Sequence, residues 1–197
     1  MAQAGEAVTF IARGAHLKAL RERGLAVASI AGDFALDPVS ATDDPASVGP
    51  VDVVLLAVKA WQVPDAAVAM RPLIGAESFV VPLENGVEAP DELAGVLGAE
   101  HAMGGLCRLL SYVTGPGAIR HSAIDPYIAF GELDRPPSDR AESLRQVFGR
   151  AKGLTAILGV GFDPGVVNAY AALAVKKYFD TIDTIDTIEL GLLWQLG

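Results

Sequence analysis

The chain has 197 residues, of which 51% are hydrophobic and 20% are charged, and its formal net charge is −9 at pH 7. Such a composition supports a folded domain with a sizeable core and excludes a disordered chain. The negative charge argues against nucleic-acid binding, because an acidic surface repels the phosphate backbone.

The sequence lacks the features of a membrane-spanning helix, a signal peptide, a disulfide and a metal site. No apolar run reaches the ~20 residues of a spanning helix, and the first ten residues lack the regions of a signal peptide. The single cysteine, Cys107, excludes an internal disulfide, and we expect it to be a small buried apolar residue. The three histidines share no metal-ligand spacing, so no metal site is expected. We therefore expect a cytoplasmic protein that does not bind a membrane.

The first predicted elements are a short strand over residues 7–12 and a helix over 15–23 that ends at Gly24. Arg13 follows the strand directly. In a dinucleotide-binding fold, a basic residue at the end of the second strand accommodates the 2′-phosphate of NADP. Arg13 is therefore a candidate for that role, and the alternative is a solvated arginine beside a helix start.

A hairpin and a loop follow. Residues 25–30 and 33–36 predict two short strands, and the polar stretch 38–50 predicts a loop. Residues 51–58 are a continuous apolar run, typical of a parallel strand covered on both faces. Lys59 comes at its end.

The next elements prepare a binding crevice. Gln62 lies three residues after Lys59, a helix opens near residue 64, and a second apolar strand over 79–83 ends in the turn Asn85-Gly86. In open parallel sheets, ligands bind beyond the carboxyl ends of the strands. We therefore expect the lysine, the amides and the turn to line a crevice, while Trp61 is expected to pack in the core.

The remaining elements up to residue 151 are less informative about function. We predict a helix over 90–97, one or two strands over 101–121 around a turn at 114–117, a strand over 126–133, and a helix that Ser138 caps.

The motifs VKAWQ and PLENGVEAPD, with VTFIARGAHLKALRERGL before them and GGLCRLLSYVTGPGAIRH and YIAFGELD after them, carry a family resemblance. Residues 2–151 resemble the ketopantoate reductase (2-dehydropantoate 2-reductase) family. The resemblance implies an α/β, Rossmann-like fold with an open, mostly parallel sheet flanked by helices. It also implies an oxidoreductase that uses NADPH to reduce ketopantoate to pantoate in pantothenate biosynthesis.

The same resemblance implies roles for individual residues. Lys59 and Asn85 would face the substrate and the nicotinamide as catalytic residues. Arg13, Lys59, Gln62, Asn85 and Gly86 would bind NADP, and the substrate would be a small 2-oxo acid. The alternatives are a surface lysine and an ordinary Asn-Gly turn. The family more often has Gln where this chain has Glu84, and a carboxylate there would repel an anionic ligand.

Two features of the family are missing from this sequence. The strand, G-x-G-x-x-G turn and helix that open a dinucleotide fold are absent from their usual place. After residue 151 the helical domain with the family's catalytic lysine is absent. We therefore expect an incomplete NADP-binding domain over residues 1–151, truncated or permuted, with impaired activity.

Residues 152–188 resemble a different family, the saccharopine dehydrogenase and carboxynorspermidine synthase group, around the motif GFDPGVVN. The resemblance implies that Asp163, Gly165 and Asn168 lie near a substrate. The segment 152–197 also has a strand-turn-helix-strand pattern, with the first strand over 154–158. A permuted sheet is one hypothesis, in which that strand pairs with 7–12 or 51–58; the alternative is that the glycines only shape a loop.

Three functions remain open. The chain is an NADP-dependent reductase of the ketopantoate type, a non-catalytic nucleotide-binding or assembly protein, or a saccharopine dehydrogenase-like oxidoreductase fragment. The segment 166–175 is apolar nearly all round, so we expect a helix there to be buried either in this chain or against a partner. The second alternative would make the protein a homo-oligomer.

Overall fold

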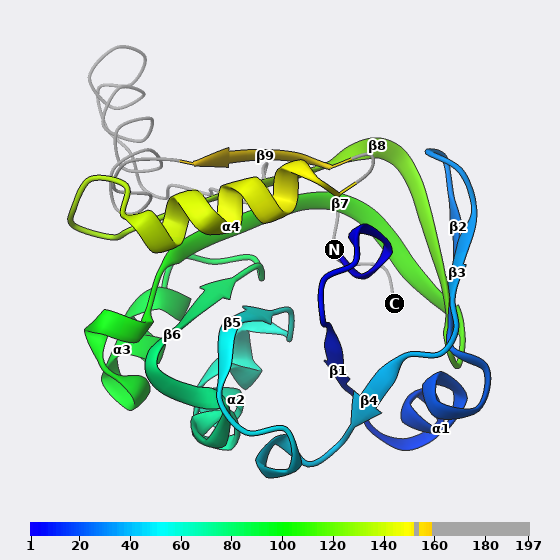
Figure 1. Cartoon of the computed structure of the whole chain (residues 1–197), viewed down its shortest axis with the longest axis horizontal. Helices are drawn as coiled ribbons and strands as arrows, with labels where there is room; N and C mark the ends of the chain where they lie inside the picture. The colour runs from blue at the N-terminus through cyan, green and yellow to red at the C-terminus, as the bar shows by residue number, and fades with distance from the viewer. Residues whose placement is uncertain (152–153, 159–197) are drawn as a thin grey trace, which may run out of the picture.

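The computed structural model describes residues 1–151 and 154–158, which form a mixed α/β fold (Figure 1). The helices are α1 (Gly14–Arg23), α2 (Val63–Ala69), α3 (Ala89–Leu97) and α4 (Asp139–Gly149), with short 3-10 turns η1 (Ala2–Ala4), η2 (Pro45–Ser47), η3 (Ala60–Gln62), η4 (Arg71–Leu73) and η5 (Ala99–His101). The strands are β1 (Thr9–Ile11), β2 (Leu25–Ser29), β3 (Phe34–Leu36), β4 (Ser40–Thr42), β5 (Val51–Leu56), β6 (Ile74–Pro82), β7 (Gly104–Gly115), β8 (Ala118–Gly131) and β9 (Thr155–Leu158).

Most strand pairs are parallel, as predicted. The pairs β1–β4, β5–β6, β2–β8 and β8–β9 are parallel, and β2–β3 and β7–β8 are antiparallel. A single bridge between Val80 and Ala102 joins β6 to the segment before β7. The close approach continues at Gly105, where an added Cβ would lie 2.3 Å from the carbonyl oxygen of Pro82. The expected mostly parallel sheet with flanking helices is therefore confirmed.

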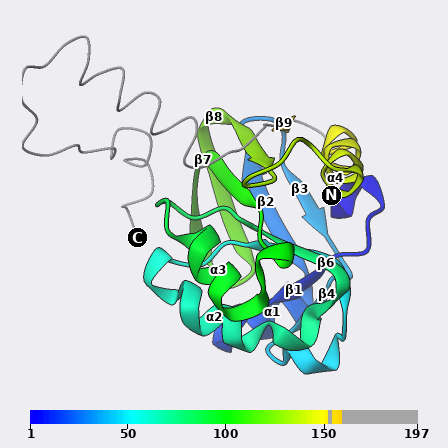
Figure 2. The ribbon, with the colours of Figure 1, turned by 90° about the vertical axis from the view of Figure 1, so that its left-hand side faces the viewer.

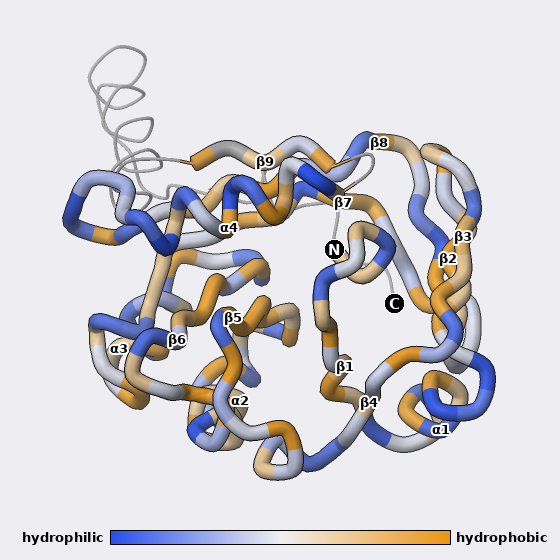
Figure 3. Tube along the Cα trace, in the orientation of Figure 1, coloured by the Kyte–Doolittle hydropathy of each residue, from blue (hydrophilic) through white to orange (hydrophobic). Residues whose placement is uncertain are grey.

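The β5–β6 ladder is covered on both faces, which explains its apolar sequence (Figure 3). On one face α2 and α3 pack together and bury Val63 and Leu93 in a cluster with Val80 (Figure 2). On the other face α4 buries Phe148 in a cluster with Val81 and Phe130. Alternate residues of one strand thus serve two cores, as a doubly covered parallel strand requires.

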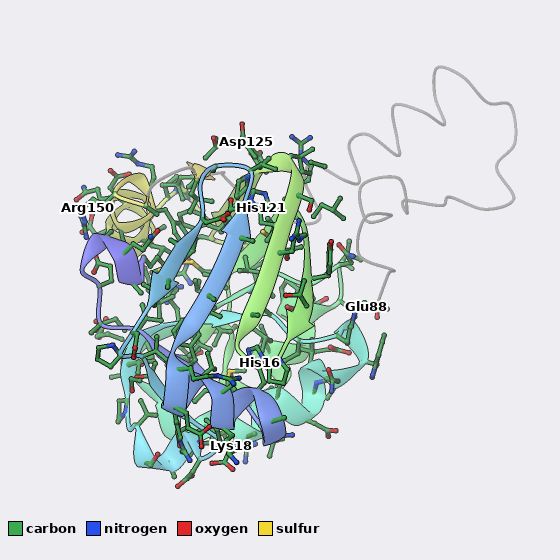
Figure 4. The ribbon with its side chains drawn as sticks, turned by 90° about the vertical axis from the view of Figure 1, so that its right-hand side faces the viewer. His16, Lys18, Glu88, His121, Asp125 and Arg150 are labelled. Atoms are coloured by element: carbon green, nitrogen blue, oxygen red, sulfur yellow. The ribbon has the colours of Figure 1, made fainter. Side chains whose placement is uncertain are left out.

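Both ends of helix α4 are held by side-chain contacts. At its start, the side chain of Ser138 accepts a hydrogen bond from the Ala141 N–H at 3.4 Å, which confirms Ser138 as the N-cap. At the other end of the helix, Arg150 (Figure 4) donates to the carboxylate of Glu6 at 3.1 Å. This contact holds the segment before β1 against the helix.

Two predictions about strands were wrong. The predicted loop over 38–50 contains β4, which the polar sequence Ser-Ala-Thr did not indicate; it forms because it pairs with β1, and the Thr9 hydroxyl donates to that of Ser40 at 3.1 Å. The two strands and the turn near 114–117 that were predicted within residues 101–121 are confirmed, but the strand predicted separately over 126–133 is the continuation of β8.

The permuted sheet is also wrong. Residues Thr155–Leu158 form a strand, as expected, but β9 pairs in parallel with residues Tyr127–Phe130 of β8. It pairs with neither β1 nor β5. β9 lies on the edge of β8 opposite β7. In this position Leu158 packs against the core cluster that contains Phe148 of α4. The predicted sites Asp163, Gly165 and Asn168 lie outside the described residues. In the described part no helix is long and apolar enough to cross a membrane.

Candidate functional site

The register of the β5–β6 ladder places the first two candidate residues at the same end of the sheet. Leu56 pairs with Pro82 in the last position of the ladder. Lys59 and Asn85 each follow their strand by three residues from that pair, and both are exposed. A cation and an amide therefore stand beyond the carboxyl ends of two adjacent parallel strands, where such sheets bind ligands.

Gln62 shapes the turn that carries Lys59. The N–H of Lys59 donates to the side-chain oxygen Oε1 of Gln62 at 3.2 Å, and the N–H of Gln62 donates back to the carbonyl oxygen of Lys59 at 2.8 Å. These two bonds fix the turn η3 and leave the ammonium of Lys59 on the surface. Gln62 is itself exposed, so its amide nitrogen is positioned as a donor next to the cation.

The turn after β6 needs glycine. Gly86 has φ of +118°, a backbone conformation that other residues rarely adopt. Asn85 and Gly86 are both exposed, so this turn lies on the surface at the end of β6.

Arg13 comes from the other parallel ladder. It follows β1 and occupies the N-cap position of α1, with an extended backbone and an exposed side chain. Because β1 pairs with β4 and not with β5, the candidate residues belong to two separate ladders of the described structure. Arg13 and Lys59 each follow a strand, and each offers a positive charge to an anionic ligand.

Glu84 directly precedes Asn85, and its carboxylate differs from the exposed charge that was expected to repel an anionic ligand. Its Oε2 accepts a hydrogen bond from the Leu83 N–H at 3.0 Å, while its Oε1 is buried and has no hydrogen-bond partner in the described part of the chain. Burial raises the pKa of Glu84, and the carboxylate of Glu92 raises it further, against lowering by backbone N–H groups. A raised pKa weakens the repulsion that the sequence predicted. The position of Glu84 directly after the apolar run 79–83 could have indicated in the sequence that its carboxylate is partly buried.

Trp61 was predicted to pack in the core, and this was wrong. Its side chain is 78% exposed, because the turn η3 lifts it away from the ladder. Val87, on the turn after β6, is 49% exposed. Two exposed apolar side chains, Trp61 and Val87, thus follow Lys59 and Asn85 in the chain by two residues each.

The charges of these residues suit an anionic ligand. Arg13 and Lys59 are cations, and Gln62 and Asn85 carry amides that can donate and accept hydrogen bonds. Among the residues that the structure describes, no group of three or more His, Cys, Asp or Glu side chains could hold a metal.

Comparison with known proteins identifies the family of the chain. The family described as ketopantoate reductase PanE/ApbA matches residues 1–135. An uncharacterized oxidoreductase, YkpB of Bacillus subtilis, is 29% identical over 161 residues, which are 81% of this chain and 52% of that protein. A 2-dehydropantoate 2-reductase of Nostoc is 35% identical over 119 residues, 60% of this chain and 37% of that protein.

A second, shorter similarity concerns a different enzyme. The carboxynorspermidine synthase of Vibrio alginolyticus is 62% identical over 39 residues, which make up 20% of this chain and 9% of that protein. The match is high in identity but too short to define the whole chain.

Solved structures share the fold. The 2-dehydropantoate 2-reductase of Geobacter metallireducens has a TM-score of 0.75 and 31% identity, covering 80% of this chain and 52% of that one. The enzyme of Porphyromonas gingivalis has a TM-score of 0.74 and 28% identity, covering 85% and 58%. The chain thus spans about half the length of the first of these relatives. Since the family match covers more than half of its residues, the chain belongs to the ketopantoate reductase PanE/ApbA family of oxidoreductases.

Proposed function

We propose that this chain is the NADP-binding part of an oxidoreductase of the 2-dehydropantoate 2-reductase type. The observation that carries the proposal is the register of β5 and β6, which sets Lys59 and Asn85 at one end of the sheet. That end is where a family of this kind is expected to hold cofactor and substrate.

The residues divide the work by their chemistry. Arg13 would accept the 2′-phosphate of NADP, since a guanidinium at the end of this strand suits a phosphate. Gln62 and Gly86 would contact the cofactor through the side-chain amide and the turn backbone. Lys59 would attract the carboxylate of a small 2-oxo acid as a point charge, and Asn85 would orient the substrate against the nicotinamide.

The reaction is a ketone reduction. A nicotinamide cofactor held by these residues would supply a hydride to the carbonyl carbon. The carbonyl oxygen gains negative charge as the carbon is reduced, and the ammonium of Lys59 would stabilise that charge. The product alcohol needs one proton on this oxygen, which water would supply. We also propose a cytoplasmic homo-oligomer that acts on a small molecule and not on nucleic acid or membranes.

Oxidation of NADPH in the presence of ketopantoate tests this function. We expect slow turnover that falls at least ~10-fold in Lys59→Met, the loss of one interaction of about 1.4 kcal/mol with the reacting oxygen. Lys18→Met is the matched control, because Lys18 is exposed on α1 and forms a surface ion pair with Glu22 at 3.9 Å. Equal rates in both variants would contradict the role of Lys59.

The short similarity to carboxynorspermidine synthase motivates one other candidate, a saccharopine dehydrogenase-like oxidoreductase. The third possibility is a nucleotide-binding or assembly protein without catalysis. Substrate choice separates them: reduction of a saccharopine-type imine but not of ketopantoate favours the former, and NADPH binding without either reaction favours the latter.

A further inference from the structure

Ser29 and His121 form a hydrogen-bonded pair away from the candidate cofactor site. They are cross-strand partners in the last position of the parallel β2–β8 ladder (Figure 4). The Oγ of Ser29 and the Nδ1 of His121 lie 2.8 Å apart. The imidazole is buried, while Ser29 is half-buried at the end of its strand. A hydroxyl within hydrogen-bond reach of a histidine ring is the arrangement that activates a serine as a nucleophile.

The other ring nitrogen sets the direction of this hydrogen bond. The Nε2 of His121 lies 2.7 Å from the carbonyl oxygen of Ile124. Because a carbonyl oxygen only accepts, Nε2 carries a hydrogen and donates it. In the neutral ring, Nδ1 then has a lone pair that accepts the hydrogen of the Ser29 hydroxyl. The ring is thus held in the tautomer in which Nδ1 can take up the serine proton.

The backbone that presents the Ile124 carbonyl departs from a regular strand. Ala123 has φ of +68°, in a region that residues other than glycine rarely adopt. The β7–β8 register also shifts between Arg108 and Leu110, opposite this part of β8. Bulges and strained residues cluster beside reactive sites, where they re-aim a group. Here the irregular segment brings the Ile124 carbonyl to the ring of His121.

The serine lies at the start of a turn whose geometry is fixed by hydrogen bonds. The N–H of Ser29 donates to Oδ1 of Asp33 at 2.8 Å, and the N–H of Gly32 donates to the Ser29 carbonyl oxygen at 2.9 Å. The N–H of Ala31 donates to the Oγ of Ser29 at 3.1 Å. A backbone donor therefore lies beside the reacting oxygen, where it can stabilise the negative charge of a tetrahedral intermediate.

We propose that Ser29 and His121 form a second reactive site, at which the serine attacks small uncharged carboxylic esters. Ile30, next to the serine, is 56% exposed and offers an apolar surface to the acyl group. The carboxylate of Asp33, which holds the Ser29 N–H, disfavours esters that carry a negative charge.

The reaction is an acyl transfer. The Ser29 oxygen forms a bond to the ester carbonyl carbon while its proton moves to Nδ1 of His121. The bond between that carbon and the alcohol oxygen then breaks, and the proton on Nδ1 passes to the departing oxygen. Water cleaves the acyl-serine by the same two steps, which restores the hydroxyl and releases the carboxylic acid. No electrons are transferred, so the reaction is independent of NADPH and of the proposed reductase function.

Covalent labelling of the full chain tests the proposal. The probe is phenylmethanesulfonyl fluoride, whose sulfur atom an activated serine oxygen attacks with loss of fluoride, and peptide mass spectrometry locates the adduct. We expect an adduct on Ser29 in the wild type and in the control Ser122→Ala, which changes the serine directly after His121. In His121→Gln, the glutamine can keep both hydrogen bonds but cannot take up the proton, so labelling should be at least ~100-fold slower.

Hydrolysis of p-nitrophenyl acetate, a small uncharged ester, is the second measurement. Release of p-nitrophenol by the wild type should exceed that by Ser29→Ala at least ~10-fold. Ser29→Ala removes only a half-buried hydroxyl, so this comparison stands even where His121→Gln does not fold. Both measurements are made without NADPH, so a chain that fails to bind the cofactor can still confirm this site. An absence of adduct on Ser29, or equal hydrolysis by the wild type and Ser29→Ala, overturns the proposal.

Discussion

Arg140 forms a two-point ion pair with Glu132, a carboxylate that is only 1% exposed. Its Nε donates to Oε1 at 2.9 Å and its Nη2 donates to Oε2 at 2.7 Å. The Ser138 hydroxyl donates to the same carboxylate, and the Arg140 guanidinium lies 5.2 Å from the centre of the Phe79 ring. The pair therefore fixes the start of α4 against β6 and against the end of β8.

Removing the arginine should unfold this corner. Arg140→Ala removes the two-point partner of the buried Glu132 carboxylate, which keeps the Ser138 hydroxyl and the Arg135 guanidinium at 3.5 Å. We therefore expect a loss of about 3 kcal/mol in the free energy of unfolding, at the lower end of the range for a broken buried ion pair. Urea denaturation measures it. Arg145→Ala is the control, since Arg145 pairs with Glu142 on the exposed face of the same helix and should change stability little. Equal losses in the two variants would contradict the importance of the buried pair.

The pair also predicts a pH dependence. Burial alone raises the pKa of Glu132, but hydrogen bonds from Arg140 and Ser138 and the charges of Arg140 and Arg135 outweigh it and lower the pKa below its ordinary value. A lowered carboxyl pKa adds stability above the unfolded-state pKa of about 4.3, and that stability is lost as the pH falls. The melting temperatures of the wild type and Glu132→Gln should therefore converge on acidification. A gap that does not change with pH would sink this assignment.

The contribution of Glu84 to stability should change with pH in the opposite direction. Its pKa is raised, chiefly by burial, so its contribution to stability is fully present below about pH 4.3 and is lost as the pH rises through the folded-state pKa. Glu84→Gln removes this loss. We expect the variant to melt at a higher temperature than the wild type near pH 7, with the difference shrinking below pH 4.3. Glu88→Gln, at an exposed position nearby (Figure 4), is the control; a similar gain there would mean a general charge effect.

Cys107 should be a poor nucleophile in the folded chain. Burial raises the pKa of its thiol to about 11, so the reactive thiolate is scarce near pH 8. A disulfide reagent such as Ellman's should therefore label the native protein slowly and the urea-unfolded protein fast. Rapid labelling of the native chain would show that the thiol is accessible and ionised.

The sequence predicted the β5–β6 unit well because its signals are local. A continuous apolar run ending in Lys59, and a second ending in Asn85-Gly86, were enough to place both strands. The parallel register that brings the two ends together follows from the fold class.

Other features depended on tertiary context. β4 is polar and only three residues long, and its strand conformation comes from pairing with β1. The sequence of β9 predicted a strand but carried no information on its partner, since the backbone groups of a strand can pair with those of any neighbouring strand. Trp61 is exposed because it lies in the turn η3, which is fixed by the hydrogen bond between Lys59 and Gln62. A pattern of apolar residues in the sequence does not reveal such a bond.

The most direct test of the proposed NADP site is the melting temperature of the chain with and without NADPH. Ligand at ~100 times its dissociation constant should add about 2.7 kcal/mol of stability, a shift of several degrees. We predict this shift for the wild type and its loss in Arg13→Ala at the same NADPH concentration, with NADH giving a smaller shift that Arg13→Ala leaves unchanged. No shift at millimolar NADPH would contradict the proposal that this chain binds the cofactor.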